Sequence, residues 1–84
     1  MKRIMKLTEK QLKDFNNPNK RLDTMRDVLG IKINDRVINT GDTMVLARNS
    51  KRLDVFKDNF NGKDYYYIIM KVVDDECAYA ISVY

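Results

Sequence analysis

The sequence predicts an α+β domain, in which an N-terminal helical segment is followed by a five-stranded antiparallel meander or small barrel. Three observations predict this class. Apolar residues recur at helical spacing up to residue 29, the apolar period changes to two after Gly30, and turn residues then follow at short intervals. A chain of 84 residues has room for one hydrophobic core. We therefore expect a single domain over 1–84, helical and basic over 1–30 and built of antiparallel strands over 31–84.

Two helices are expected before Gly30. Thr8 and Gln11 form a capping-box pair, which predicts a short helix from about residue 9. The Asn-Asn-Pro sequence at 16–18 should end this helix, because the residue before a proline avoids helical geometry. The second helix is predicted over Pro18–Leu29, with proline at its first position and Gly30 at its end.

The strands are delimited by turn residues. Asn61-Gly62 is the strongest of these signals, because both residues accept the positive φ of a two-residue type I′ hairpin. This turn places Phe60 opposite Lys63 and Val55 opposite Ile68. The five expected strands lie near Ile31–Ile38, Thr43–Arg48, Leu53–Phe60, Lys63–Val73 and Cys77–Tyr84.

A second turn at Asp74-Asp75 supports the same arrangement. A two-residue loop there pairs Val72 with Cys77 and Ile68 with Ile81. Both turns then put apolar side chains on one face of the sheet, which we expect to be its core face. That set comprises Leu53, Val55, Tyr66, Ile68, Met70, Val72, Cys77, Tyr79 and Ile81.

The sequence offers little for catalysis. It has no histidine, the side chain best suited to proton transfer near neutral pH. The single cysteine, Cys77, follows Asp74, Asp75 and Glu76, whose charges disfavour a reactive thiolate. These three adjacent carboxylates lack the spacing of a calcium loop, and the sequence has no glycine-rich phosphate loop. We expect no enzyme activity, no metal and no cofactor.

Cellular location follows from apolar runs and cysteine content. The run Tyr65–Met70 is far too short to cross a bilayer, and the Met-Lys-Arg start leads into no apolar signal region. A lone cysteine cannot form an internal disulfide and is typical of a reducing compartment. We expect a cytoplasmic protein without a membrane partner.

Two kinds of side chain predict contact surfaces. Phe60 and Tyr65, near the predicted hairpin turn, are expected to be exposed for stacking or interface contact. Positive charge gathers in residues 1–26, where eight Lys and Arg face three acids within a chain of net charge +4. Such a basic third either lines a nucleic-acid backbone or forms a solvated helix face. The candidate basic residues are Lys10, Lys13, Lys20 and Arg21, together with Arg48, Lys51 and Arg52 around a predicted turn.

The stretch Thr-Gly-Asp-Thr-Met-Val-Leu-Ala at 40–47 resembles the opening Gly-Asp-x-Val-Val-x-Ala strand of small Src-homology-3-like barrels found in tailed-phage accessory proteins. The resemblance implies a phage-encoded protein in the host cytoplasm that binds and modulates or inhibits a host protein, such as a defence or transcription component. It transfers no site residue. Two hypotheses follow: a non-catalytic protein-binding module, or a small basic nucleic-acid-binding module.

Overall fold

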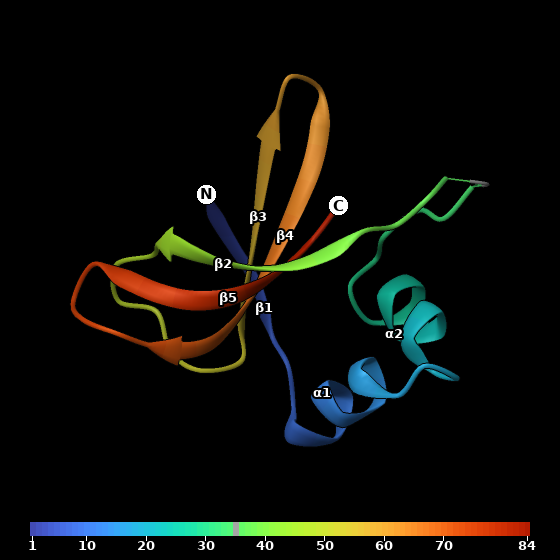
Figure 1. Cartoon of the computed structure of the whole chain (residues 1–84), viewed down its shortest axis with the longest axis horizontal. Coiled ribbons are helices and arrows are strands. Elements are labelled where there is room, and N and C mark those ends of the chain that lie inside the picture. The colour runs from blue at the N-terminus through green and yellow to red at the C-terminus, as the bar shows by residue number, and fades with distance from the viewer. Residues whose placement is uncertain (35) are drawn as a thin grey trace. The chain divides into compact units, whose positions relative to one another are not determined.

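The computed structural model describes residues 1–34 and 36–84, which form two compact units. One unit holds Met1–Lys6 and Ile38–Tyr84, and the other holds Leu7–Val37. The α+β class is confirmed, although a strand precedes the helices. In chain order the elements are β1 (Lys2–Lys6), α1 (Glu9–Asn16), α2 (Arg21–Asp27), β2 (Thr40–Leu46), β3 (Asp54–Phe60), β4 (Lys63–Val72) and β5 (Cys77–Val83) (Figure 1).

Helix α1 begins where the capping box places it. The backbone N–H of Gln11 donates to Thr8 Oγ1 at 3.1 Å, and the Thr8 N–H donates to Gln11 Oε1 at 2.9 Å. Both bonds satisfy N–H groups that the first helical turn leaves unpaired. Leu12 and Phe15 supply the buried side of the helix. Among the described residues, no helix is long and apolar enough to span a membrane.

Helix α2 is shorter than the predicted Pro18–Leu29. The Asn17 side chain accepts from the Asn19 N–H at 3.0 Å, so residues 17–20 form a turn in place of the first helical turn. The helix also ends earlier than predicted, at Asp27 in place of Leu29. Gly30, with a φ of 73°, lies in the turn that follows, and beyond it the Ile31 N–H donates to the Met25 carbonyl at 3.0 Å.

The prediction of a strand at Ile31–Ile38 is wrong, because none of the described residues in this range lies in a strand. Ile31 is buried, which accounts for its apolar character without a sheet partner. The fifth strand is instead β1, which pairs with β3 and carries Lys2, Arg3 and Lys6. An edge strand tolerates these charges because its side chains and outer edge meet solvent.

The strands form one antiparallel sheet in the order β1-β3-β4-β5-β2. Only β3, β4 and β5 make a meander, and β2 joins the far side of β5. Among the strands that the structure describes, β1 and β2 are therefore the two edge strands, each paired on one side only. The sheet is open, and the small barrel that was one of the two expected arrangements does not form. β2 also begins and ends earlier than the predicted Thr43–Arg48.

The predicted register is confirmed in the centre of the sheet and wrong beyond it. Val55 faces Ile68 and Ile68 faces Ile81, as expected. A bulge between Ile69 and Lys71 then shifts the pairing, so Val72 faces Ala78 and not Cys77. The loop between β4 and β5 accordingly spans residues 73–76 and is not a two-residue turn.

Both faces of the central sheet are buried. Val55, Tyr66 and Ile68 are buried on the predicted core face, but Tyr79 on that face is 38% exposed. The bulge moves Val72 to the other face, where it is 41% exposed. The opposite face holds a cluster formed by Ala47, Phe56, Ile69, Ala78 and Ala80, with Val45 and Tyr67 packed against it.

The β3–β4 turn has the predicted geometry, with φ of 52° at Asn61 and 77° at Gly62. A Cβ at Gly62 would meet no atom within 4 Å, so a substitution acts through the backbone and not through a clash. We expect Gly62→Val to lower the free energy of unfolding by about 1–2 kcal/mol in urea melts, because a β-branched residue resists positive φ. Gly62→Asn is the matched control and should lose less, since asparagine tolerates this conformation. Equal stability of the valine variant would contradict the proposed role of the turn.

Candidate functional site

The outer part of the β3–β4 hairpin is a two-stranded ribbon. β5 ends at Val83, opposite Tyr66, and β1 begins at Lys2, opposite Lys57. Among the described strands, residues 58–60 and 63–65 therefore pair only with each other, and the hairpin extends beyond the other strands (Figure 1). The sequence positions this ribbon through its turn, because Asn61 and Gly62 fix where the two strands reverse.

One face of the ribbon carries aromatic rings and a lysine, which we call the hairpin aromatic surface: Phe60, Lys63, Tyr65 and Tyr84. Phe60 is 66% exposed and lies directly opposite Lys63. The Tyr65 and Tyr84 ring centroids are 5.4 Å apart. Lys63 Nζ lies 5.0 Å from the Tyr84 ring centroid and 5.6 Å from that of Tyr65. Cation–π attraction orients the lysine over both rings and limits the rotamers of all three side chains.

The other face of the ribbon carries polar cross-strand contacts. Asn59 Nδ2 donates to Asp64 Oδ1 at 2.9 Å, and Lys57 Nζ lies 3.7 Å from Asp64 Oδ2. These bonds hold the strands together where β1 and β5 no longer support them. The two faces thus differ in composition, although the face with the aromatic rings also carries Asp58, directly opposite Tyr65.

Tyr67 links the hairpin aromatic surface to the buried cluster. Burial raises the pKa of its hydroxyl, and the nearby Asp58 carboxylate and Tyr65 raise it further. The raised pKa keeps the Tyr67 hydroxyl protonated well above neutral pH, and its side chain is half-buried, as are those of Tyr65 and Tyr84.

The predicted basic residues of the helical unit have intramolecular partners in most cases. Asp14 accepts from Lys10 Nζ at 3.3 Å and lies 3.7 Å from Lys20 Nζ. Arg21 Nε donates to the Phe15 carbonyl at 2.8 Å, and its guanidinium lies 5.1 Å from the Phe15 ring centroid. Lys13 is exposed on the same helix as Lys10. Arg21 thus has a structural role, which the sequence prediction did not foresee.

The second basic group lies in the connection between β2 and β3. Arg48 Nη2 contacts Glu76 Oε1 at 3.0 Å, so its charge is compensated within the chain. The Lys51 N–H donates to Asp54 Oδ2 at 2.8 Å, and the Lys51 side chain is exposed. Arg52 is exposed in the following turn. These cations and the hairpin aromatic surface lie in the same unit, whereas Lys10, Lys13, Lys20 and Arg21 belong to the helical unit.

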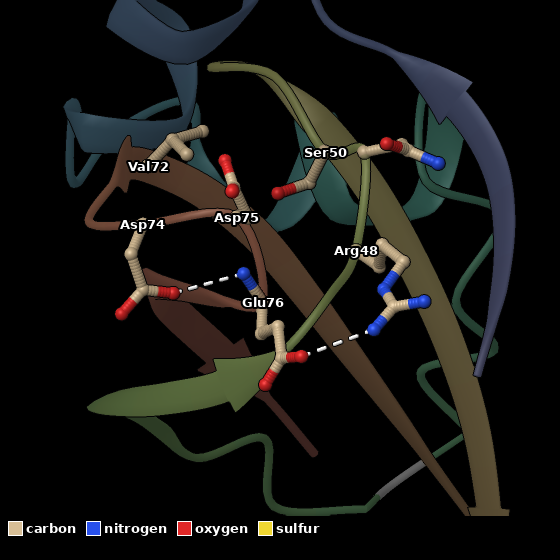
Figure 2. A pocket seen from close by; sticks show the side chains of 7 residues that line it. Arg48, Ser50, Val72, Asp74, Asp75 and Glu76 are labelled. Carbon is tan, nitrogen blue, oxygen red and sulfur yellow. Dashed lines mark hydrogen bonds and ion pairs between the residues drawn. The ribbon is translucent and has the colours of Figure 1, made fainter.

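The β2–β3 connection and the 73–76 loop enclose a pocket of about 560 Å³ (Figure 2). Asp74 and Glu76 lie on one side of this pocket, and Ser50 and Arg48 lie on the other. Asp74 Oδ1 accepts from the N–H groups of Glu76 and Cys77, at 2.8 Å each. The complete lining is Arg48, Asn49, Ser50, Val72, Asp74, Asp75 and Glu76.

These two backbone bonds, first that from Glu76 and then that from Cys77, lower the pKa of Asp74. A carboxyl whose pKa is lower in the folded state stabilises the fold above its unfolded pKa, and this contribution is lost as the pH falls through the folded pKa. We therefore expect that, in a pH titration followed by NMR, the amide signals of Glu76 and Cys77 keep their neutral-pH chemical shifts until the pH falls below the range in which an ordinary aspartate titrates. Asp74→Ala should abolish this titration step. An ordinary aspartate midpoint at these amides would contradict the assignment.

Two features escaped the sequence prediction. Tyr84 ends the predicted Cys77–Tyr84 strand, and its stacking against Tyr65 can be inferred only once the β4–β5 register is known. Ser50 carries no sequence signal of its own. Over residues 1–34 and 36–84, no group of three or more His, Cys, Asp or Glu side chains has the geometry of a metal site.

Cys77 is half-buried at the start of β5 and unpaired as a thiol. Its backbone N–H is bound to Asp74, so the residue belongs to the turn that closes the pocket. Comparison with known proteins adds no assignment to this geometry: no protein-family model, no curated protein and no solved structure matches the chain.

Proposed function

We propose that this chain is a non-catalytic binding module that contacts a protein partner through the hairpin aromatic surface. The observation that carries the proposal is the exposure of Phe60, at 66%, on the same ribbon face as the paired Tyr65 and Tyr84 rings. An aromatic side chain held in solvent on a rigid scaffold is typical of interface anchors, because it buries a large area at little cost in side-chain entropy.

The resemblance of residues 40–47 to phage accessory barrels supports a host protein as the partner. A small protein that modulates or inhibits such a partner in the host cytoplasm needs a projecting contact surface and no catalytic centre. The two-stranded ribbon supplies such a projection. A defence or transcription component remains the class of partner that this reading favours.

Nucleic-acid binding is the second candidate, supported by the net charge of +4 and by the clustered lysines. The ion pairs of Lys10 and Lys20 with Asp14, and of Arg48 with Glu76, weigh against it. Cations already paired within the chain contribute less to phosphate binding than free ones. We therefore rank it below the protein interface.

The test uses two variants of the full chain with folding checked first. Phe60→Ala should abolish capture of the partner from nuclease-treated host lysate, because it removes the exposed anchor. A triple variant with Lys10, Lys13 and Lys20 changed to glutamine should retain capture. Arg21 is left unchanged in it, because it holds the Phe15 carbonyl. The captured protein is then purified and its affinity for both variants measured.

Salt dependence separates the two functions. Binding to duplex DNA should show a slope of about −0.9 in log affinity against log salt for each phosphate contacted, whereas an aromatic protein interface is far less sensitive. We expect weak binding to random-sequence DNA at physiological salt. Submicromolar, salt-dependent binding to DNA or RNA that the triple glutamine variant loses would overturn the protein-interface proposal.

A further inference from the structure

The pocket beneath the 73–76 loop lies apart from the hairpin aromatic surface and combines negative charge with a buried polar atom. Its three acids, Asp74, Asp75 and Glu76, face a single cation, Arg48, so the lining carries a net charge of −2. This is opposite in sign to the chain as a whole, which carries +4. The pocket is therefore a local anionic site on a cationic protein.

Two of the three carboxylates are fixed by the fold. Asp74 receives two backbone N–H bonds through Oδ1, and Glu76 is paired with Arg48. Asp75 has no hydrogen bond or ion pair with any residue in the described part of the chain. The remaining oxygen of Asp74 and both oxygens of Asp75 are thus available as acceptors at the pocket.

Ser50 is the second, independent observation. It is only 8% exposed, and its Oγ is buried without a hydrogen-bond partner among the residues that the structure describes. A buried hydroxyl of this kind costs free energy unless a ligand completes its bonding. Figure 2 shows this hydroxyl directed across the pocket toward the loop that carries Asp75.

We infer that this pocket binds a guanidinium or ammonium group at the end of a flexible alkyl chain. The carboxylates supply charge, Ser50 Oγ and the Asn49 side chain supply neutral acceptors, and Val72 supplies an apolar contact for the alkyl stem. A guanidinium suits several acceptors around one pocket especially well, because its five N–H donors spread in a plane. The bound cation is either the side chain of a basic protein partner or a free polyamine.

The test is an NMR titration of the full chain with the capped peptide acetyl-Gly-Arg-Gly-amide. Its control is the citrulline peptide, which has the same shape without the charge. We expect the arginine peptide to shift the amide signals of residues 48–50 and 72–77, and the citrulline peptide to leave them in place. Spermidine, titrated separately, identifies the source. Tighter binding of the peptide assigns the site to a protein side chain, and tighter binding of spermidine assigns it to a free polyamine; both support the cation site.

Three variants test the residues. Asp75→Asn should weaken peptide binding about tenfold, because it removes an ionised acceptor without changing the shape of the side chain. Ser50→Ala should weaken it about threefold while leaving the thermal midpoint of the free protein unchanged or higher, since the hydroxyl has no protein partner to lose. Asp42→Asn removes one negative charge from the same unit outside the pocket and should leave affinity unchanged.

Three results would overturn the inference: no localised shifts with the arginine peptide, equal shifts with citrulline, or equal losses from Asp75→Asn and Asp42→Asn. The last would show general charge attraction without a site. The hairpin variants of the proposed function do not enter this experiment. Phe60→Ala should leave peptide binding unchanged, so failure of either proposal can be recognised separately.

Discussion

Replacing Ile69 with alanine should lower the free energy of unfolding by about 3 kcal/mol, the largest effect that we expect from a single substitution. The Ile69 side chain is fully buried among Phe56, Ala78 and Ala80. The neighbouring alanines are too small to move into the space that the substitution leaves, so the cavity cost adds to the lost transfer energy. Urea denaturation followed by circular dichroism measures the change.

Leu46→Ala is the matched control, because Leu46 is 76% exposed at the end of β2. Its loss should stay within about 0.5 kcal/mol, as for most exposed positions. Comparable losses at the two positions would mean that the face of the sheet carrying Ile69 is not a packed core.

Asp54→Ala should lower the free energy of unfolding by about 2 kcal/mol. Asp54 is 5% exposed, and one of its oxygens both accepts from the Lys51 N–H at 2.8 Å and lies 3.2 Å from Arg3 Nε. Alanine removes the acceptor of the backbone N–H and the partner of the arginine together. The loss should be smaller than for a fully buried ion pair, because the Arg3 side chain is about half exposed and is rehydrated when it loses its partner.

Two further variants divide this effect. Asp54→Asn keeps an oxygen for the Lys51 N–H and should lose roughly half as much as Asp54→Ala. Arg3→Ala removes the ion pair, the bond from Arg3 Nη2 to the Asn49 carbonyl and the contact with the Phe56 ring. If Asp54→Ala were as stable as the natural protein in the same urea melts, the contacts of the Asp54 carboxylate with the Lys51 N–H and with Arg3 would not stabilise the fold.

The sequence determines local structure well wherever a few neighbouring residues decide it. Thr8 and Gln11 form their capping box within one turn of α1, and Asn61 and Gly62 adopt positive φ through their own conformational preferences. The pairing of Val55 with Ile68 follows directly from that turn. Each of these features is confirmed because its cause lies within about ten residues of chain.

The parts that failed depend on partners far away in sequence. β1 lies in the segment that was predicted to be helical and basic, because its lysines are poor strand formers and its partner β3 is distant in sequence. The bulge beside Met70 has no local signal, yet it moves Val72 to the opposite face.

The residues of the candidate sites also differ in whether neighbouring or distant parts of the sequence determine their positions. Phe60 and Tyr65 were predicted together because the turn fixes their shared face. Tyr84 joins them only through the pairing of β4 with β5, and Ser50 meets the 73–76 loop only after β2 has aligned with β5. Counting charges does not locate the acidic partners of Lys10 and Arg48, because one lies a helical turn away and the other is distant in sequence.

The place of β1 in the sheet also bears on how the chain is completed during synthesis. β1 precedes its partner β3 by roughly 50 residues, and ribosomes add about 5–20 residues per second, so β1 remains without its partner for several seconds. The intervening unit, Leu7–Val37, has contacts that are local in sequence and can form in that interval. A waiting strand rich in lysine and arginine repels other copies of itself. We therefore expect these charges to disfavour premature strand pairing in the nascent chain.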